Sequence, residues 1–301
     1  KKTIKSSALT IGTFDGMHKG HHYLIDKLLN FSSKKNIPSA LITFTPNPYT
    51  IINNIESRDY HIISREKKCN LIEKAGLDIL LELKFDSSIS NMSAYEFLRK
   101  IIVETFNPKD IVVGHDHHFG KNRGGNSEFL EKYQDEFAYN LHLVEAFALN
   151  EKTVSSSLIR GLLLSGDLNL ANAYLGWNYQ ISGLIIAGSK LGREISFPTA
   201  NISLDSVNQL IPSDGVYFMQ GIIEGEKYTG MCNIGCKPTF KKNKDKTIEV
   251  HLFDYNKYDL YDKYITIEFV DYIRSEKKFI NKEDLKEQLK KDKEYCMNIL
   301  N

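Results

Sequence analysis

The sequence has little cysteine, little arginine and no long apolar segment, and each shortage excludes a class of protein. Only four of its 301 residues are cysteines: Cys69, Cys232, Cys236 and Cys296. So few thiols, so widely spaced, do not form a disulfide scaffold and suit a reducing compartment. Uninterrupted apolar runs such as Leu162–Leu164 are far shorter than the ~20 residues that a membrane-spanning helix needs. We therefore expect a cytoplasmic protein without a membrane partner.

An excess of either charge is also missing. Lys and Arg total 39 and Asp and Glu total 38, so the formal net charge is +1, which argues against a general nucleic-acid binder. Arginine is scarce, with seven residues against 32 lysines: Arg58, Arg65, Arg99, Arg123, Arg160, Arg193 and Arg274. The planar Arg fork binds phosphates and carboxylates in a way that Lys does not reproduce. The last four, which lie in motif-like segments, are therefore the most informative.

Length and composition predict two globular domains. At ~150 residues per domain, 301 residues correspond to about two. The hydrophobic and charged fractions of 42% and 26% are those of globular proteins. The chain begins with Lys1 rather than Met, so we expect further residues upstream. The lysines near this end imitate a signal peptide, but Asp15 interrupts the apolar run that follows.

The first half alternates between strand and helix patterns. Strands are predicted at Ala8–Gly12, Ser39–Thr45, Ile79–Phe85, Asp110–Gly114 and His142–Glu145, and helices at His21–Ser32, Arg65–Ala75, Ala94–Phe106, Ser155–Ser165 and Leu168–Leu175. Strands separated by helices indicate βαβ units. We therefore expect a Rossmann-like α/β domain whose parallel sheet is covered on both faces.

After Trp177 the pattern changes to short strands split by Gly, Pro, Asn and Asp. The strands are Ile181–Ile186, Val216–Ile222, Tyr228–Asn233, Ile248–Leu252 and Tyr264–Phe269, followed by a helix at Lys282–Leu300 with Leu285, Leu289 and Met297 on one side. This pattern is typical of an antiparallel sheet or barrel. We predict an α/β domain over residues 1–178 and an antiparallel β-barrel with a closing helix over residues 179–301.

The segment from Gly12 to His21 follows a predicted strand and opens a predicted helix, which is where α/β sheets bind ligands. Its glycines let the backbone approach a phosphate, and the helix N-terminus supplies N–H donors. His18 and His21 are spaced to face one phosphate and to stabilise charge that develops on it during attack. The alternative is a Gly-rich turn with two exposed histidines.

A second anion-binding pattern lies at Ser155, Ser156 and Ser157, which precede a predicted helix containing Arg160. A serine cluster is a good helix N-cap by itself. A capped helix start also binds anions, so the two interpretations are compatible.

Two groups in the second half suit phosphoryl transfer. Ser189, Lys190 and Arg193 lie in a Gly-containing loop that suits nucleotide phosphates. Thr199 and Asn201 are neutral oxygen donors that suit a Mg²⁺ shared with those phosphates.

A general base is predicted on a nearby strand. Glu249 lies two residues from His251, so both side chains face the same side of that strand. Glu249 is placed to accept the proton of a primary hydroxyl that attacks a γ-phosphate. The alternative is a carboxylate on a solvated strand face.

Motifs in both halves resemble known families in the expected order. Gly12–His21 is similar to the nucleotidylyltransferase superfamily, and Thr43–Pro48, Val112–Gly120 and Ser155–Arg160 resemble the prokaryotic FAD synthetase module. Gly188–Arg193, Phe197–Asn201, Gly215–Tyr217, Pro238–Phe240, Glu249–His251 and Arg274–Phe279 resemble the riboflavin kinase signature. The resemblance covers nearly the whole chain and is to the bifunctional riboflavin kinase/FMN adenylyltransferase family.

This resemblance implies two steps of flavin cofactor synthesis. Riboflavin is phosphorylated by ATP to FMN, and FMN is adenylylated to FAD with release of pyrophosphate. The implied ligands are riboflavin, FMN, FAD and ATP, with Mg²⁺ as cofactor. Neither nucleic acid nor membrane is implied, and we expect a monomer or weak homo-oligomer. The implied catalytic residues are Glu249, His18 and His21, and the metal ligands are Thr199 and Asn201.

The resemblance also implies substrate-binding residues. Those for ATP and phosphate are Gly12, Phe14, Asp15, Gly16, Gly20, Ser155, Ser156, Arg160, Gly188, Ser189, Lys190, Gly192, Arg193 and Pro198. Those for flavin are Asn47, Asp116, His117, Arg123 and Arg274. Arg123 lies in a segment that resembles a mobile basic loop over a substrate. Arg274 either contacts the flavin or pairs with Glu276 or Asp271.

The segment Gly114–Gly120 departs from the family, which usually has an aromatic-rich GFDFRFG-like run there. Here His115, His117 and His118 surround Asp116, which suggests a transition-metal site. However, alternation along an extended segment sends His118 to the side opposite His115 and His117, which makes one shared ion awkward. We favour histidines in place of two family aromatics, and this reduces the expectation of flavin stacking.

Smaller departures are Thr13, where the family often has Asn, and Ser196, where it commonly has Gly. Cys232 and Cys236 form a C-x₃-C pair without a second Cys/His pair of zinc spacing, so we predict buried thiols.

Three other functions remain open. In the first, the chain retains only one of the two activities. In the second, it is an adenylyltransferase for another nucleotide and carries an accessory barrel. In the third, the barrel senses flavin and has no catalytic role. Thr199, Asn201 and Glu249 argue against a sensing barrel. The kinase-type barrel argues against a different nucleotide.

Overall fold

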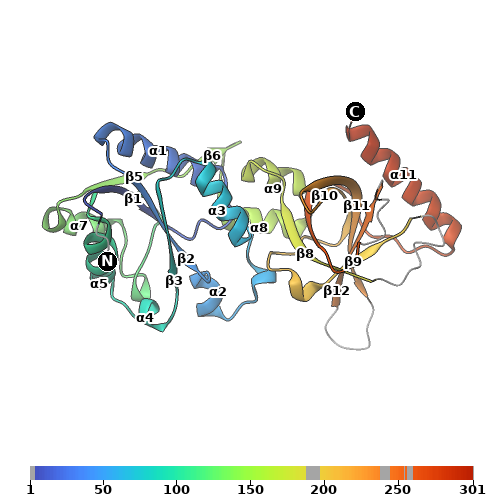
Figure 1. The fold of residues 1–301 in the computed structure, drawn as a ribbon, viewed down its shortest axis with the longest axis horizontal. Helices are drawn as coiled ribbons and strands as arrows, with labels where there is room; N and C mark the ends of the chain where they lie inside the picture. Colours follow the sequence, from blue (N-terminus) through green and yellow to red (C-terminus); the bar gives the residue numbers. More distant parts are fainter. Residues whose placement is uncertain (1–3, 188–196, 238–244, 254, 256–259, 301) are drawn as a thin grey trace. The chain divides into compact units, whose positions relative to one another are not determined.

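The computed structural model describes residues 4–187, 197–237, 245–253, 255 and 260–300 (Figure 1). The chain forms two compact units. The first consists of Lys1–Glu56 and Arg65–Ser156, and the second of Ser57–Ser64 and Ser157–Asn301.

Helix α9 (Leu168–Leu175) belongs to the second unit. The Asn172 side chain donates to the Phe269 carbonyl (3.0 Å) and accepts from the Tyr179 N–H (2.7 Å). The functional boundary predicted at residue 178 stays a prediction.

The first unit contains a five-stranded sheet in the order β3-β2-β1-β4-β5, and every neighbouring pair is parallel. Its strands are β1 (Ser7–Ile11), β2 (Ser39–Thr45), β3 (Ile79–Lys84), β4 (Pro108–Gly114) and β5 (Asn140–Val144). β1 lies at the centre and is buried along its whole length (Figure 1). This confirms the predicted Rossmann-like parallel sheet.

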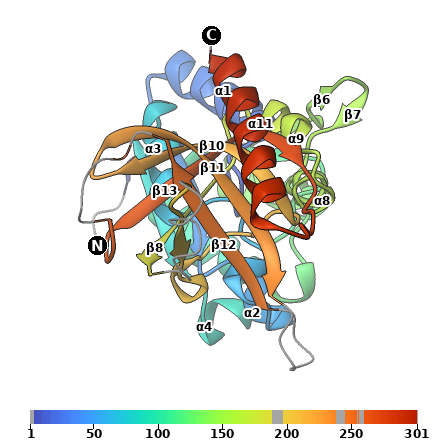
Figure 2. The ribbon, with the colours of Figure 1, turned by 90° about the vertical axis from the view of Figure 1, so that its right-hand side faces the viewer.

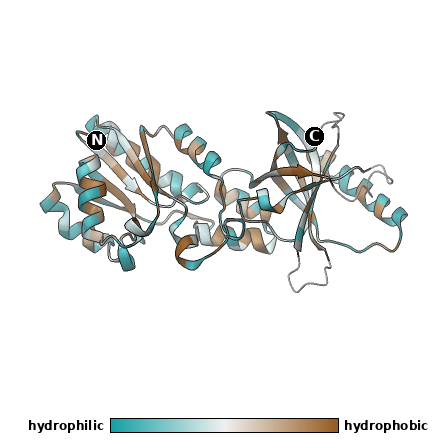
Figure 3. Cartoon of the chain, turned by 60° about the horizontal axis from the view of Figure 1, so that its bottom comes forward, coloured by the Kyte–Doolittle hydropathy of each residue, from teal (hydrophilic) through white to brown (hydrophobic). Residues whose placement is uncertain are grey.

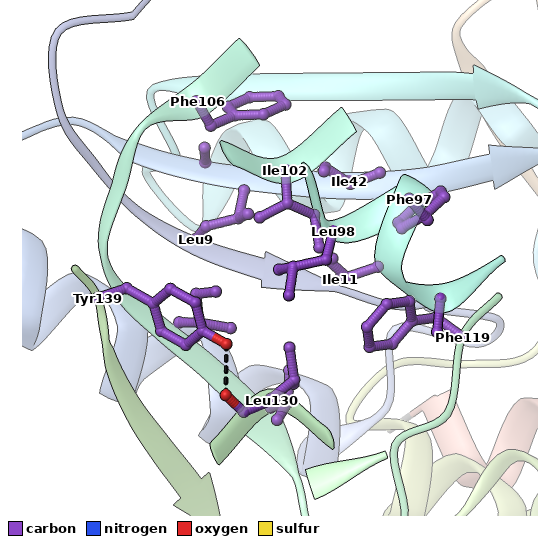
Figure 4. Close-up of a cluster of buried hydrophobic side chains, with 14 residues drawn as sticks. Leu9, Ile11, Ile42, Phe97, Leu98, Ile102, Phe106, Phe119, Leu130 and Tyr139 are labelled. Atoms are coloured by element: carbon purple, nitrogen blue, oxygen red, sulfur yellow. Dashed lines mark hydrogen bonds between the residues drawn. The ribbon is translucent and has the colours of Figure 1, made fainter. Parts of the chain in front are cut away.

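Helices cover both faces of this sheet. One face packs against a continuous helical segment and α7 (Ser127–Phe137), and the other against α1 (Lys19–Lys35). The segment consists of α5 (Ala94–Glu96), the π-helical η2 (Phe97–Val103) and α6 (Glu104–Phe106). Alternate β1 residues serve the two faces, as the strand period requires. Leu9 and Ile11 contact Leu98 and its neighbours (Figure 4), whereas Ala8 packs with Leu28 of α1.

The remaining helices and strands that precede the barrel in the sequence are short. They are α2 (Pro48–Asn53), η1 (Ser57–Asp59), α3 (Arg65–Lys74), α4 (Ser87–Ser90), η3 (Lys121–Arg123), β6 (Ala148–Leu149), β7 (Lys152–Thr153) and α8 (Ser156–Ser165). The sequence patterns did not predict α2, α4 or α7.

The sheet has a topological switch point at β1, whose neighbours are β2 on one side and β4 on the other. Parallel sheets bind ligands in the crevice outside the carboxyl ends of the strands at such a point. The segments Gly12–His21 and Gly114–Gly120 leave β1 and β4 at this edge. The topology therefore brings two of the sequence motifs together.

The second unit contains a closed barrel in the order β10-β11-β12-β9-β8-β13 (Figure 2), with antiparallel neighbours throughout. Its strands are β8 (Gln180–Ile186), β9 (Ala200–Ile202), β10 (Gly215–Ile223), β11 (Glu226–Lys237), β12 (Asp245–Leu252) and β13 (Tyr264–Arg274), with η4 (Leu204–Ser206) after β9. This confirms the predicted barrel. The three-residue β9 was not predicted as a strand.

The closing helix α11 (Lys282–Leu300) is confirmed and lies against the barrel (Figure 2). Leu285, Leu289 and Cys296 join a cluster of buried barrel side chains. Met297 is 41% exposed, so its prediction on the packed side was wrong. The packed stripe runs instead through Asp292 and Cys296, which continue the helical spacing of the two leucines. Hydropathy colouring shows hydrophobic residues along the strands, and both hydrophobic and hydrophilic residues on α11 (Figure 3).

None of the four cysteines, all within the described residues, forms a disulfide. Cys232 is buried as predicted, but Cys236 is only half-buried, with its thiol donating to Asp214 (3.3 Å). No helix in the described part of the chain is both long and apolar enough to cross a membrane.

Candidate active sites

His18 and His21 lie side by side at the start of α1. His18 is the N-cap, and its Nδ1 accepts a hydrogen bond from the His21 backbone N–H (3.3 Å). The two rings stack with centroids 3.6 Å apart and planes 15° apart. Gly20 leaves room for this arrangement, because a Cβ there would lie 3.1 Å from the His18 ring. Since Nδ1 of His18 accepts, Nε2 carries the proton of the neutral ring.

The His21 ring is half-buried and neutral. Burial, followed by the positive charge of His18, lowers the pKa of His21 well below its usual value, and His22 and Lys68 add to this shift. Nδ1 of His21 is buried and has no hydrogen-bond partner among the described residues. The start of α1 therefore holds a neutral His21 imidazole beside His18 at a helix N-terminus, which favours anions.

The loop between β1 and α1 folds around Asp15, which is buried. Ser156 Oγ donates to the Asp15 carbonyl (2.6 Å), so the predicted serine element, with Ser155, lies against this loop. Phe14 has a left-handed backbone (φ 49°). Its ring lies so close to Gly12 that a Cβ there would be 3.0 Å away. The predicted phosphate-binding residues Gly12 to Gly20 thus all lie in the loop after β1 and the first turn of α1.

A turn, rather than an extended segment, follows β4. The His117 N–H donates to the Gly114 carbonyl (3.1 Å). The His117 ring stacks on Phe119 with centroids 5.8 Å apart, whereas His115 and His118 are exposed. The expected alternation, with His115 and His117 on one side, was wrong because the turn breaks the extended geometry. No group of three His, Cys, Asp or Glu residues in the described part of the chain has a metal-binding arrangement.

The exposed side of this turn carries two predicted flavin ligands, Asp116 and Arg123. His118 Nδ1 lies 2.8 Å from the Asp116 carbonyl and 3.0 Å from Arg123 Nη2. On the inner side, burial lowers the pKa of His117 to about 4. Its Nε2 is buried without a partner among the described residues.

Asn47 and Arg160 each have a structural partner. Asn47 caps α2, where its side chain accepts from the Tyr49 N–H (3.0 Å). Arg160 Nε donates to the Tyr60 carbonyl (2.9 Å), and its guanidinium lies over the Tyr60 ring, 3.7 Å from the centroid. Stacking of this kind fixes the orientation of the guanidinium plane.

The second unit contains a cavity of about 360 Å³ between the barrel and α11. Thr199, Glu249 and Arg274, all predicted from the sequence, line it together with His251 and the two α11 leucines, Leu285 and Leu289. A concave, largely apolar space with a few converging polar groups is the usual form of a small-molecule site.

Glu249 lies in a polar row across three strands. It is directly opposite Asn201 of β9 and Asn233 of β11, and directly opposed residues project to the same face. His251, two residues further along β12, lines the same cavity, as the alternation predicted. Its Nδ1–H donates to the Pro198 carbonyl (2.7 Å). Burial lowers the pKa of His251, so the neutral ring presents an unprotonated Nε2.

Arg274 pairs with Asp292 of α11. Its Nε lies 3.0 Å from both carboxylate oxygens of Asp292, and its Nη2 lies 2.8 Å from Oδ2. The alternative that Arg274 pairs with Glu276 or Asp271 was wrong, because helix α11 carries a buried carboxylate to the same place. Glu276 instead accepts from Asn233 Nδ2 (3.2 Å).

Several predicted residues lie outside the described part of the chain. They are Gly188, Ser189, Lys190, Gly192, Arg193 and Ser196, together with the motif Pro238–Phe240.

Comparison with known proteins agrees with this division of the chain. The FAD synthetase family model matches residues 1–158 and the riboflavin kinase model matches residues 175–300. A bifunctional riboflavin kinase/FMN adenylyltransferase from Buchnera aphidicola subsp. Schizaphis graminum is 38% identical over 100% of this chain and 96% of its own length. The chain belongs to the bifunctional riboflavin kinase/FMN adenylyltransferase family.

Other relatives support this membership. The family member of the same name from Bacillus subtilis is 37% identical over 98% of this chain and 92% of its own length. A crystal structure described as a macrolide-efflux protein from Streptococcus pneumoniae has a TM-score of 0.87 and 30% identity, covering 98% of this chain and 95% of its own. The fold of both units is therefore shared with that structure.

The sequence motifs missed some residues at these two sites. Asn233 lines the barrel cavity, and Asp292 holds Arg274. Glu276, which lies within the motif Arg274–Phe279 but was not predicted to contact substrate, also lines the cavity. In the first unit, Lys68 of α3 is buried near the β1 loop. Asn233 ends the predicted strand Tyr228–Asn233 and lies in no motif. A lysine inside the predicted helix Arg65–Ala75 gives no local signal of burial.

Proposed function

We propose that this chain is an enzyme with two activities, phosphorylation of riboflavin to FMN and adenylylation of FMN to FAD. One observation carries the proposal: two separate sets of reactive groups occur in one chain. The stacked pair His18 and His21 follows β1, and Glu249 lies beside Thr199 in the barrel cavity. The matches to both family models support the same assignment.

In the barrel, Glu249 is the proposed general base. The primary hydroxyl oxygen of riboflavin attacks the γ-phosphorus of ATP, the bond from that phosphorus to its bridging oxygen breaks, and ADP leaves. Glu249 accepts the hydroxyl proton. Asn201 and Asn233 lie directly opposite Glu249 on the two neighbouring strands, and His251, two residues along β12, is fixed by the Pro198 carbonyl. Positioning and charge neutralisation supply most of the rate in such transfers.

The groups beside Glu249 fit a magnesium ion. Thr199 and Asn201 offer neutral oxygens next to a carboxylate, a donor set that hard cations prefer. We propose Thr199 and Asn201 as its protein ligands, and when bound it would neutralise charge on the ATP phosphates. The residues proposed to contact those phosphates are Gly188, Ser189, Lys190, Gly192, Arg193 and Pro198.

In the first unit, His18 and His21 are proposed to stabilise charge on the α-phosphate of ATP. A phosphate oxygen of FMN attacks the α-phosphorus and pyrophosphate leaves, so no protein nucleophile is needed. Imidazole N–H groups suit this role, because they donate hydrogen bonds to phosphate oxygens. The residues that the family resemblance implies for ATP in this reaction, and that we propose for it, are Gly12, Phe14, Asp15, Gly16, Gly20, Ser155, Ser156 and Arg160.

The proposed flavin ligands occupy the carboxyl edge of the sheet and the barrel cavity. Asn47 follows β2, and Asp116, His117 and Arg123 follow β4. Arg274 lines the barrel cavity and is proposed to face the flavin there. We also propose functional domains over residues 1–178 and 179–301, a monomer or weak homo-oligomer, a cytoplasmic location and no nucleic-acid partner.

The test is a product analysis with the purified full chain. Riboflavin, ATP and Mg²⁺ are supplied, and flavins are separated by chromatography over time. FMN is expected first, followed by FAD. Omitting Mg²⁺ and adding excess EDTA should abolish both products, because each step uses ATP phosphates whose charge needs neutralising. Formation of FMN alone, or of neither flavin, would overturn the two-activity proposal.

A further inference from the structure

Lys68 is a buried lysine beneath the loop that carries His18 and His21. It extends from α3 and is 8% exposed. Its Nζ donates to Thr43 Oγ1 (3.2 Å), and Thr43 Oγ1 donates in turn to the Thr13 carbonyl (3.1 Å). Thr43 lies near the end of β2, and Thr13 follows β1. The ammonium group therefore lies at the carboxyl edge of the sheet, next to the switch point.

The hydrogen bonding of this ammonium is incomplete. A lysine ammonium has three N–H donors, and Thr43 Oγ1 is its one hydrogen-bond acceptor among the described residues. Lysines are almost never fully buried unless they are paired, because burial removes the hydration of the charge. Two N–H donors of a buried cation are thus left for something outside the described chain.

The charges around Lys68 favour an anion. Burial lowers the pKa of Lys68, while the nearby carboxylate of Asp15 and, more weakly, that of Glu82 oppose this shift. Lys68 also acts on His21, whose pKa it helps to lower. His21 Nδ1 is a second buried nitrogen without a partner. The N-terminus of the 17-residue helix α1 adds positive potential at the same loop.

We propose that Lys68 is a phosphate-binding residue of the adenylyltransferase site, with its ammonium donating to phosphate oxygens of the bound nucleotide and of the pyrophosphate product. This inference rests on the proposed function and adds a residue to it. Three features converge on one place: the two remaining Lys68 donors, the His18–His21 pair and the start of α1. Charge that passes to pyrophosphate during adenylyl transfer is stabilised best by a fixed cation shielded from water.

The alternative is a structural role, in which Lys68 only balances the buried carboxylate of Asp15. The two roles predict different results for an anion that binds the folded protein. A phosphate-binding residue changes the affinity for pyrophosphate, whereas a structural counter-ion changes stability alone.

The experiment measures binding of inorganic pyrophosphate with Mg²⁺ to the full chain by calorimetry. The variants are Lys68→Met, Lys68→Arg and the control Lys74→Met, which removes an exposed lysine from the same helix. Lys68→Met should weaken binding about 10- to 150-fold, the loss expected for a hydrogen bond to a charged group. Lys68→Arg should restore much of the affinity, and Lys74→Met should bind like the unmodified chain.

Melting curves and FAD synthesis complete the test. Pyrophosphate binding by folded Lys68→Met as tight as that of the unmodified chain would overturn the inference. If Lys68→Met does not fold, Lys68→Gln replaces it, and loss of the fold in both neutral variants would assign Lys68 to structure and also overturn the inference. Failure of the unmodified chain to make FAD would instead count against the proposed function. If it makes FAD and the Lys68→Met rate is unchanged, only the inference fails.

Discussion

Arg274 and Asp292 form a two-pronged ion pair that joins the last barrel strand to the C-terminal helix. The Asp292 side chain is 2% exposed and that of Arg274 is 13% exposed. Gln288 Nε2 also donates to Asp292 Oδ1 (2.9 Å), so the carboxylate is held from both sides. Arg274 lines the barrel cavity, as do Leu285 and Leu289 of the same helix. The pair therefore fixes one wall of the proposed riboflavin site.

Removing Asp292 should destabilise this wall. Asp292→Ala leaves the Arg274 guanidinium half-buried without its carboxylate, and breaking a buried pair in this way costs ~3–5 kcal/mol. Urea unfolding should show this loss in the free energy of unfolding. The exposed acidic residue Glu294 on the same helix is a matched control, and Glu294→Ala should change stability by less than about 0.5 kcal/mol. Equal stability of the two variants would mean that the pair does not hold α11.

Local patterns allowed much of the fold and part of each site to be predicted. The β1 loop with His18 and His21 is contiguous in sequence, and Glu249 with His251 follows strand alternation. Residues that act across elements could not be found this way. Lys68 meets Thr43 across 25 positions, and Asp292 meets Arg274 across 18.

Missed elements have different causes. In α7, Phe129, Leu130, Tyr133 and Phe137 recur at helical spacing and pack on the core, and Asn126 caps the start of the helix by accepting from the Phe129 N–H (2.9 Å). The local sequence of α7 therefore does indicate a helix. β9 has only three residues, and its pairing with β8 and β12 defines it more than its own composition does. So short a strand depends on tertiary pairing.

The half-buried ring of His117, whose Nε2 atom is buried, should make the fold sensitive to acid. Its pKa is about 4 in the folded chain and about 6.5 when unfolded. As the pH falls through this interval, the unfolded chain binds the proton and the folded chain does not, so the free energy of unfolding falls. Above pH ~6.5 both states are neutral and His117 contributes no pH dependence.

Comparison of two variants isolates this effect. Between about pH 7.5 and about pH 5, His117 should account for a loss of roughly 2 kcal/mol, from ~1.4 kcal/mol per pKa unit. His117→Phe should lose that much less stability over the same interval. His115→Gln, at an exposed neighbouring histidine, should lose as much as the unmodified chain. Parallel pH profiles for all three proteins would show that His117 is not buried as a neutral ring.

Glu249→Gln should remove the kinase activity alone. The amide keeps the shape of the side chain but does not accept the hydroxyl proton, so FMN formation from riboflavin should fall ~10²–10⁴-fold, the usual contribution of a general base. Adenylylation of supplied FMN should continue, because Glu249 lies in the barrel and His18 and His21 lie in the other unit. The two rates are measured separately by chromatography of the flavin products.

The converse variant, His18→Ala with His21→Ala, should remove adenylylation alone. Lost transition-state donors commonly cost ~10²–10³-fold each, so this variant should accumulate FMN from riboflavin and make almost no FAD. Both variants must melt like the unmodified chain, since an unfolded unit would give the same loss. If Glu249→Gln stopped FAD synthesis from FMN as strongly as FMN synthesis, the two reactions would share one site. Riboflavin phosphorylation and FMN adenylylation would then not be divided between the barrel and the α/β unit, although their proposed reactive groups are.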